Sequence, residues 1–469
     1  MTAPLWTAID AAAATKGQAT RPFAAEGVSI DSRTVAKGDL FVALKGPSFD
    51  GHDYVADALT KGAAAAIVTR RPEGCDDAPL LIVENTDDAL SGLARAARRR
   101  TRAKIAAVTG SVGKTGTKEA LAIALAGQGK TAHSPGNLNN QWGLPLSLAR
   151  LPADAVYGVF ELGMNHAGEI AQLTRLAQPD VAIITTIAPV HLEYFTSTFE
   201  IAEAKAEIFE GMSGGTAVLN RDNAYFPLLA GHAAGRGVGR VFGFGAHPDA
   251  TARLEACEVD SDGTSVEANL DGKELRYRLG LPGRQWALSS LAVLAATAAL
   301  GADVEIAMEA LTRMEGLDGR GRRHKVSLPS GAISLIDESY NASPVSMRAA
   351  IDVLAASKPG AGGRRIAVLG DMLELGPSSA AMHAALAEAL TENGIDLVFL
   401  VGKQMAALES ELPRAMRGGC STTSDEAIAS IIAQLREGDV VTVKASHGIR
   451  TDRIVRAILA AGRAAPTRH

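Results

Sequence analysis

The chain has 469 residues and a mass of 48.5 kDa, which is enough for two to four domains with separate cores. Its net charge of -5 gives no reason to expect a nucleic-acid partner. Its three cysteines (Cys75, Cys257, Cys420) lack CxxC spacing, which argues against a cysteine-based zinc site and indicates a reducing compartment. Without a signal peptide or a bilayer-spanning segment, we expect a cytoplasmic protein, and we expect it to be a monomer.

Residues 1–98 alternate short apolar stretches with one helical stretch. VSIDSR, DLFVALKG and AAAAIVT are typical of strands, and DYVADALTKG is typical of a helix. The basic cluster RAARRRTRAK (residues 95–104) is short and leads directly into an apolar strand. We interpret it as a solvated helix end and linker rather than as a binding patch. The prediction for residues 1–98 is an α/β domain.

Residues 99–315 continue the alternation with longer elements. The strand KIAAVT, a glycine loop and a helix are followed by the strands AVYGVFELG and DVAIITTIAPVHLE and by a further helix. This order predicts a mostly parallel sheet with helices on both faces.

The Gly/Arg-rich stretch EGLDGRGRR then separates a third region, residues 316–469. Its strands AISLIDE, RRIAVLGDM, DLVFLVGK and DVVTVKASHG each enter a helix, one of them capped by Ser343 with Pro344 in its first turn. The fold prediction is therefore α/β in three domains, the last one doubly wound and Rossmann-like.

The loop between the strand KIAAVT and its helix has the composition of a phosphate site. It consists of Gly110, Ser111, Val112, Gly113, Lys114 and Thr115. Backbone N–H groups and the helix N-terminus would face the anion, the lysine would neutralise it, and the threonine hydroxyl could ligate Mg²⁺. Val108 replaces the first glycine of the usual GxxxxGK[ST] pattern. An ordinary glycine turn is the alternative.

Three polar residues follow the next apolar segments and should meet at the same sheet edge. Glu161 ends a strand, where it could hold the metal of a nucleotide, and His191 follows the next strand. Lys205 lies on the apolar face of a helix that we predict over residues 197–212, with a capping box of Ser197 and Glu200. No carboxylate of that helix can pair with it, so the alternative is a lysine whose head group reaches water.

Three further polar clusters have both a functional and a purely structural interpretation. GNLNNQWGLP (residues 136–145) offers side-chain amides for a polar substrate, or is a turn built on asparagine. NRD (residues 220–222) and DESYN (residues 337–341) follow strands and either contact a ribose or base or form turns.

Several motifs, in their order and spacing, resemble the Mur ligases. They are TGSVGKT, GNLNNQWGLPLSL, ELGMNHAGEI, APVHLEYF, AKAEIFEGM, DESYNASPVSM and LGDMLELG. The opening IDSRTVAKGDLFVALKGPSFDGHDYV is similar to the UDP-binding N-terminal domain of that family, and GNxNN with DxSYNAxPxSM resembles its D-alanyl-D-alanine-adding type. The resemblance implies an ATP-dependent ligase that joins D-Ala-D-Ala to UDP-N-acetylmuramoyl-tripeptide through an acyl phosphate, in peptidoglycan synthesis.

The resemblance also implies residue roles. Lys114 and the loop amides would hold the phosphates of ATP, and Thr115 and Glu161 would bind one Mg²⁺. A second Mg²⁺ would be shared by Glu161, His191 and a Lys205 that CO₂ has converted to a carbamate. The other nucleotide contacts would be Asn220, Asp222, Arg320 and Asp337. The contacts to the UDP-muramoyl-peptide would be Ser32, Arg33, Asn137, Asn139, Asn140 and His166.

The chain departs from the family pattern at three places. Gly116 replaces a usual Thr or Ser, Gln285-Trp286 replaces a His-Asn pair, and His447 lies in ASHG where GSRG is usual. Two alternatives to the D-Ala-D-Ala ligase are another amino-acid ligase of this superfamily and a nucleotide-binding switch without ligase activity. The chain lacks the NKxD motif that GTPase switches use to read their base.

Overall fold

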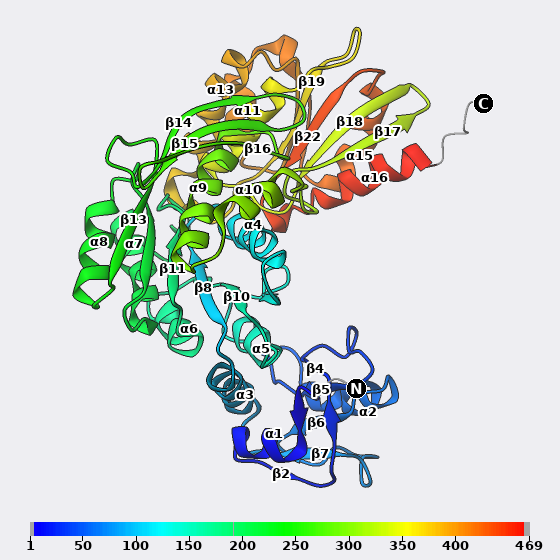
Figure 1. Ribbon diagram of the computed structural model, residues 1–469. Coiled ribbons are helices and arrows are strands. Elements are labelled where there is room, and N and C mark those ends of the chain that lie inside the picture. Colours follow the sequence, from blue (N-terminus) through cyan, green and yellow to red (C-terminus); the bar gives the residue numbers. More distant parts are fainter. Residues whose placement is uncertain (1–3, 191, 464–469) are drawn as a thin grey trace.

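The computed structural model describes residues 4–190 and 192–463. Three large sheets of five, nine and six strands follow one another along the chain, and residues 6–7 and 24–25 form a further two-stranded sheet. Figure 1 shows the large sheets as three bodies, with the N-terminal body at the bottom and the C-terminal body at the top. The predicted three-part α/β architecture is confirmed. Within the described residues, no helix is long and apolar enough to cross a membrane.

The N-terminal body is built on the sheet β2-β7-β6-β5-β4, which is parallel except for β2. The strands and the helix predicted here are present as β4, β5, β6 and α2. Helix α1, which the pattern did not reveal, packs against α3, whose basic C-terminal end the sequence indicated. The elements are β1 (Trp6–Thr7), α1 (Ala8–Thr15), β2 (Gln18–Ala19), β3 (Ala24–Ala25), β4 (Gly27–Ser29), β5 (Asp39–Val42), η1 (Gly51–Tyr54), α2 (Val55–Thr60), β6 (Ala65–Val68), β7 (Leu80–Ile82) and α3 (Thr86–Arg100).

The central sheet has the order β16-β15-β14-β13-β12-β11-β8-β10-β9. It is parallel from β9 to β14, and the sequence pattern did not predict the antiparallel strands β15 and β16 at its far edge. The elements are β8 (Lys104–Thr109), α4 (Lys114–Ala126), β9 (Thr131–His133), α5 (Gly143–Ala149), β10 (Tyr157–Glu161), α6 (Glu169–Ala177), β11 (Val181–Ile184), α7 (Thr198–Ala206), η2 (Glu207–Gly211), β12 (Thr216–Asn220), α8 (Phe226–Gly235), β13 (Arg240–Gly245), β14 (Ala252–Val259), β15 (Thr264–Leu270), β16 (Lys273–Leu279), α9 (Arg284–Ala299) and α10 (Val304–Thr312).

Both faces of the central sheet are buried, which explains its continuous apolar strands. Alternate residues of β8 enter two different cores: Ala106 and Val108 pack with α4 and α9, whereas Ile105 and Ala107 pack on the side of α5, α6 and α7. The loops that follow the parallel strands therefore meet at one edge of the sheet.

The C-terminal body has the sheet order β17-β18-β22-β19-β20-β21, parallel except for β17. Ser343 caps α11 with Pro344 in its first turn, as predicted. The elements are β17 (Arg322–Leu328), β18 (Gly331–Glu338), α11 (Pro344–Ala356), β19 (Arg365–Gly370), η3 (Gly376–Ser378), α12 (Ser379–Ala384), α13 (Leu386–Glu392), β20 (Leu397–Val401), α14 (Ala406–Glu411), η4 (Arg414–Met416), β21 (Arg417–Ser421), α15 (Ser424–Gln434), β22 (Val440–Lys444), η5 (His447–Ile449) and α16 (Asp452–Arg463).

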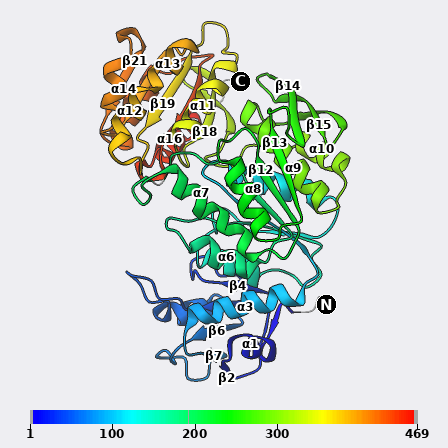
Figure 2. The same cartoon turned by 90° about the vertical axis from the view of Figure 1, so that its left-hand side faces the viewer.

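Helix α3 connects the N-terminal and central bodies and lies across their boundary (Figure 2). The prediction of a solvated basic helix end is wrong for two of its arginines. Arg98 donates to the carbonyls of Ala177 and Gln178, both at 2.9 Å. Arg100 donates to the carbonyl of Leu5 at 2.6 Å and stacks on the Trp6 ring. These guanidinium groups therefore bind backbone carbonyls of both bodies, because a long cation can bridge between the ends of packed elements.

Candidate active site

The loop between β8 and α4 has the shape that phosphate binding requires. Gly110 has φ +142° and Gly113 has φ +86°, conformations that favour glycine. A Cβ on Gly110 would overlap the hydroxyl of Thr185, at the end of β11. That hydroxyl donates to the carbonyl of Val112 at 2.6 Å, and the N–H of Ser111 donates to the carbonyl of Thr186 at 2.8 Å. The loop is therefore held against the neighbouring strand before any ligand binds.

Lys114 begins α4 and folds back over this loop. Its Nζ donates to the carbonyl of Gly110 at 2.7 Å. Burial lowers the pKa of Lys114, Glu161 opposes this shift, and Arg320 from the C-terminal body adds to it. The charges of Lys114 and Arg320 thus interact from different bodies, and a bound anion would favour the charged form of Lys114.

Glu161 ends β10 and is buried, with 2% of its surface exposed. Its two carboxylate oxygens have different donors: Thr115 Oγ1 binds Oε2 at 2.7 Å, and Asn139 Nδ2 binds Oε1 at 2.7 Å. The carboxylate, the threonine hydroxyl and the lysine of the phosphate loop therefore gather at one point, as the spacing predicted.

Lys205 is fully buried in α7, and its Nζ has no hydrogen-bond partner among the described residues. Burial lowers the pKa of Lys205 well below the ordinary lysine value, Lys114 lowers it further, and nearby glutamates, among them Glu207 and Glu161, oppose the shift. The burial expected from the helical period is confirmed, and the alternative of a head group in water is wrong. The side chain favours the neutral amine.

The helix that carries Lys205 is shorter than predicted. Ser197 caps it by accepting from the N–H of Glu200, but the Glu200 carboxylate binds the N–H and hydroxyl of Thr196, so no reciprocal capping box forms. The α-helix ends at Ala206 and continues as the 3-10 turn η2. The Glu207 carboxylate turns away to accept from N–H groups of the first turn of α6, a tertiary contact that the helical pattern does not contain.

The predicted nucleotide contacts separate into two groups. Arg320 stacks on the Tyr340 ring at 4.0 Å, and its charge lowers the pKa of Lys114. The other three polar groups bind their own surroundings. The side chain of Asn220 donates to the carbonyl of Thr185, the carboxylate of Asp222 accepts from two N–H groups of residues 246–247, and the carboxylate of Asp337 accepts from Gly319 and Ser339.

The amide-rich loop combines both interpretations that the sequence allowed. Asn139 binds Glu161 and so belongs to the site. Asn140 forms a turn, because its Oδ1 accepts from the N–H groups of Trp142 and Gly143 at 3.2 and 2.9 Å. Asn137 is exposed.

Two other predicted substrate residues lie in the N-terminal body. Arg33 forms a fork on Asp31, which lowers the pKa of that carboxyl, and the carbonyl of Ser32 accepts from Lys61 at 2.8 Å. In the described part of the chain, neither residue is hydrogen-bonded to the central body. His191 lies outside the described residues.

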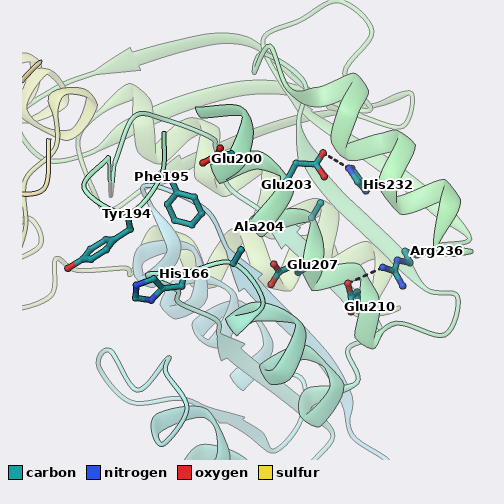
Figure 3. A pocket seen from close by; sticks show the side chains of 12 residues that line it. His166, Tyr194, Phe195, Glu200, Glu203, Ala204, Glu207, Glu210, His232 and Arg236 are labelled. Atoms are coloured by element: carbon teal, nitrogen blue, oxygen red, sulfur yellow. Dashed lines mark hydrogen bonds and ion pairs between the residues drawn. The ribbon is translucent and has the colours of Figure 1, made fainter. Parts of the chain in front are cut away.

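His166 lies at the mouth of a separate acidic pocket (Figure 3). Its ring meets Tyr194 edge-on at 5.1 Å, and its Nδ1 lies 3.1 Å from Glu169 Oε1. The pocket, of about 420 Å³, is lined by the polar face of α7 and η2, where Glu203 pairs with His232 and Glu210 with Arg236. Lys205 is not among its lining residues.

Two features of this site do not follow from the sequence pattern. Lys118 is fully buried in α4, one turn after Thr115, and binds the start of the amide-rich loop. Gly116 lies against the indole of Trp286, and a Cβ there would be 2.8 Å from Trp286 Cη2. In the sequence, Gly116 and Trp286 are two separate departures from the family pattern, and the structure shows that they are in contact.

Three family models match the chain in succession. "Mur ligase family, catalytic domain" matches residues 25–98, "Mur ligase middle domain" matches residues 108–297, and "Mur ligase, glutamate ligase domain" matches residues 321–447.

Full-length relatives and solved structures match as well. The UDP-N-acetylmuramoyl-tripeptide–D-alanyl-D-alanine ligases of Rickettsia prowazekii and Escherichia coli are 35% and 36% identical, over 91% and 92% of this chain and 94% and 93% of theirs. A crystal structure of MurF from Acinetobacter baumannii is 29% identical with a TM-score of 0.84, covering 97% of this chain and 99% of that one. MurF from Thermotoga maritima in complex with ADP has 29% identity and a TM-score of 0.77, covering 93% and 98%.

Proposed function

The chain belongs to the Mur ligase family, and from this premise we propose that it is the ATP-dependent ligase that adds D-Ala-D-Ala to UDP-N-acetylmuramoyl-tripeptide. The product would be the UDP-linked pentapeptide used in peptidoglycan synthesis. The observation that carries the proposal is the convergence of Lys114, Thr115 and Glu161 at one sheet edge, in a chain whose full-length relatives carry this activity in their names.

The chemistry begins with an unreactive carboxylate. The terminal carboxylate oxygen of the tripeptide attacks the γ-phosphorus of ATP, ADP leaves, and an acyl phosphate forms. The amine of D-Ala-D-Ala then attacks the acyl carbon, giving a tetrahedral intermediate that loses a proton and expels phosphate. The first step brings two anions together, and the second develops negative charge on the acyl oxygen and the leaving phosphate, so both need positive charge at the phosphates. Lys114 and Arg320 supply it from two bodies.

The donor set fits Mg²⁺, which prefers oxygen ligands. Thr115 offers a hydroxyl and Glu161 a buried carboxylate, already hydrogen-bonded to each other. Asn139 orients the second carboxylate oxygen. Bound there, Mg²⁺ would neutralise negative charge on the phosphates of ATP. Among the described residues, no three His, Cys, Asp or Glu side chains form a metal cluster, so a second ion, with His191 as a ligand, needs a further anion.

Lys205 can supply that anion. A neutral buried amine attacks CO₂ through its nitrogen lone pair and loses a proton, which gives a carbamate. The lowered pKa favours the amine that reacts, and the carbamate would give the partnerless Nζ a charge opposite to that of Lys114. We therefore assign Lys205 as a carbamylated ligand of the second Mg²⁺.

The remaining assignments complete the proposal. Residues 1–98 would bind the UDP-muramoyl part, residues 99–315 would bind ATP, and residues 316–469 would bring in the dipeptide, in a cytoplasmic monomer. ATP would be contacted by the phosphate loop, Asn220, Asp222, Arg320 and Asp337. The UDP-muramoyl-tripeptide would be contacted by Ser32, Arg33, Asn137, Asn139, Asn140 and His166.

A phosphate-release assay tests the proposed function. Purified protein with ATP, Mg²⁺ and UDP-N-acetylmuramoyl-tripeptide should release phosphate at a substantial rate only after D-Ala-D-Ala is added. Release with a single free amino acid, but not with the dipeptide, would favour a different ligase. Nucleotide binding without any substrate-dependent ADP formation would favour a switch and would refute the proposal.

A further inference from the structure

Lys118 is a buried cation whose hydrogen-bonding capacity is fully used. It lies in the interior of α4 with no exposed surface. Its Nζ donates to the carbonyls of Ser134 at 2.5 Å and Gly136 at 3.1 Å, and it lies 2.6 Å from Glu119 Oε1. An ammonium group has three donors, and each has an acceptor here. Burying such a charge is expensive unless it is paired in this way.

The two carbonyls that Lys118 binds lie where β9 leads into the amide-rich loop. Ser134 directly follows β9, and Gly136 is the first residue of that loop. Ser134 also contacts the next strand. Its N–H donates to the carbonyl of Val159 at 3.1 Å, and its Oγ accepts from the N–H of Glu161 at 3.2 Å. The ammonium group thus fixes the point where the loop leaves the sheet, beside the strand end that carries Glu161.

The far part of the same loop returns to Glu161. Asn139 Nδ2 binds Glu161 Oε1, and the carbonyl of Asn139 accepts from the N–H of Gly163 at 2.8 Å. The other oxygen of Glu161 binds Thr115, which precedes Lys118 by three residues on α4. Residues three apart lie on the same side of a helix. Helix α4 therefore reaches Glu161 twice, directly through Thr115 and indirectly through Lys118 and the loop.

We propose that Lys118 is a positioning residue that holds loop 134–140, and through it Glu161, in register with the phosphate loop. The proposal rests on the proposed function, because it connects the ATP site to the side that binds the muramoyl-peptide. Lys118 contacts no substrate in this scheme. Without its ammonium group, the carbonyls of the buried Ser134 and of the exposed Gly136 lose this donor, and among the described residues the loop keeps its bonds to β10 and Gly163.

The test replaces Lys118 by methionine, which has a similar length and no charge. For Lys118→Met we expect kcat/KM to fall about 10- to 100-fold, since a misplacement of about 1 Å can cost about 100-fold. The KM for UDP-N-acetylmuramoyl-tripeptide should rise, whereas ADP alone should bind with an unchanged Kd. Hydrogen–deuterium exchange should become faster in peptides that cover residues 134–142 and should stay unchanged over residues 110–117.

Lys130→Met is the matched control. Lys130 precedes β9, is exposed, and pairs with Asp154 on the surface at 2.6 Å, so its removal should leave the kinetic constants and exchange unchanged. Lys118→Gln keeps a donor and should give an intermediate effect. It also replaces Lys118→Met in the same measurements if that variant does not fold.

A purely structural role predicts a different result. The active fraction would fall in proportion to the folded fraction, with unchanged KM and unchanged exchange in loop 134–140, and that outcome would overturn the proposal. The exchange measurement needs no turnover. An inactive wild-type protein would therefore refute the ligase assignment alone, and the behaviour of loop 134–140 would still decide the role of Lys118.

Discussion

Two lysines are fully buried in helices on opposite faces of the central sheet, and their surroundings differ. Lys118 in α4 has three acceptors within 3.1 Å. Lys205 in α7 has no hydrogen-bond partner among the described residues, and burial lowers its pKa well below the ordinary value. Burial alone therefore does not define the chemistry of a lysine. A complete set of acceptors retains a cation that organises its neighbours, whereas an incomplete set favours a nucleophilic amine.

The largest expected difference between these lysines is in turnover. Lys205→Ala should fold and lose at least about 1,000-fold in kcat/KM, because it would remove the carbamate that we propose as a ligand of the second Mg²⁺. Added formate or acetate should restore part of the activity by occupying the vacated space. Ile201→Ala, on the same buried face of α7, is the control for a cavity and should retain most activity. Turnover of Lys205→Ala at the wild-type rate would contradict a catalytic role for Lys205.

A second experiment detects the proposed carbamate directly. Protein equilibrated with ¹³CO₂ should show a carbamate carbon resonance. This signal should be absent from Lys205→Ala and present in Lys118→Met, because the proposed carbamate forms on Lys205. A resonance that persists in Lys205→Ala would place the carbamate elsewhere.

Replacing each of the two lysines by methionine should change the stability of the protein in opposite directions. In CO₂-free buffer with a chelator, Lys205→Met should raise the free energy of unfolding near pH 7 by about 1–3 kcal/mol, by removing a buried amino group that has no hydrogen-bond partner among the described residues. Lys118→Met should lower it by a similar amount, by leaving two carbonyls without a donor. Urea midpoints measured in parallel would check both signs.

The gain from Lys205→Met should depend on pH. The pKa of Lys205 is lower in the folded than in the unfolded chain. Between these two values the unfolded chain binds more protons, so wild-type stability rises with pH. The advantage of the methionine variant should therefore shrink as the pH approaches about 10.4, the unperturbed lysine value. A constant difference from pH 7 to 10 would contradict a lowered pKa.

The smallest expected effect comes from Gly116→Ala, which changes the packing of α4 without changing Lys118 in the same helix. Gly116→Ala adds a Cβ at 2.8 Å from Trp286 Cη2, and such overpacking costs about 1–3 kcal/mol. Alanine recovers about 1 kcal/mol of helix propensity. We expect a net loss of about 1 kcal/mol without a change in the exchange of loop 134–140. In a Trp286→Leu background, the same substitution should be neutral or stabilising.

The sequence predicted those parts of the site that depend on spacing within one segment or on a helical period. The phosphate loop follows from spacing along one segment, and the burial of Lys205 follows from the helical period. Lys118 gave no signal, because its acceptors are backbone carbonyls of a loop 16 to 18 residues away. The end of α7 at Ala206 was missed because Glu207 binds another helix. Such tertiary contacts override local propensity.

The contact between Gly116 and Trp286 has an evolutionary consequence. The indole fills the space of a Cβ at position 116, so neither change is easily accepted without the other. We expect relatives with Thr or Ser after the GKT motif to carry a smaller side chain at the position of Trp286. The two positions should therefore covary among homologues, although they are 170 residues apart in the sequence.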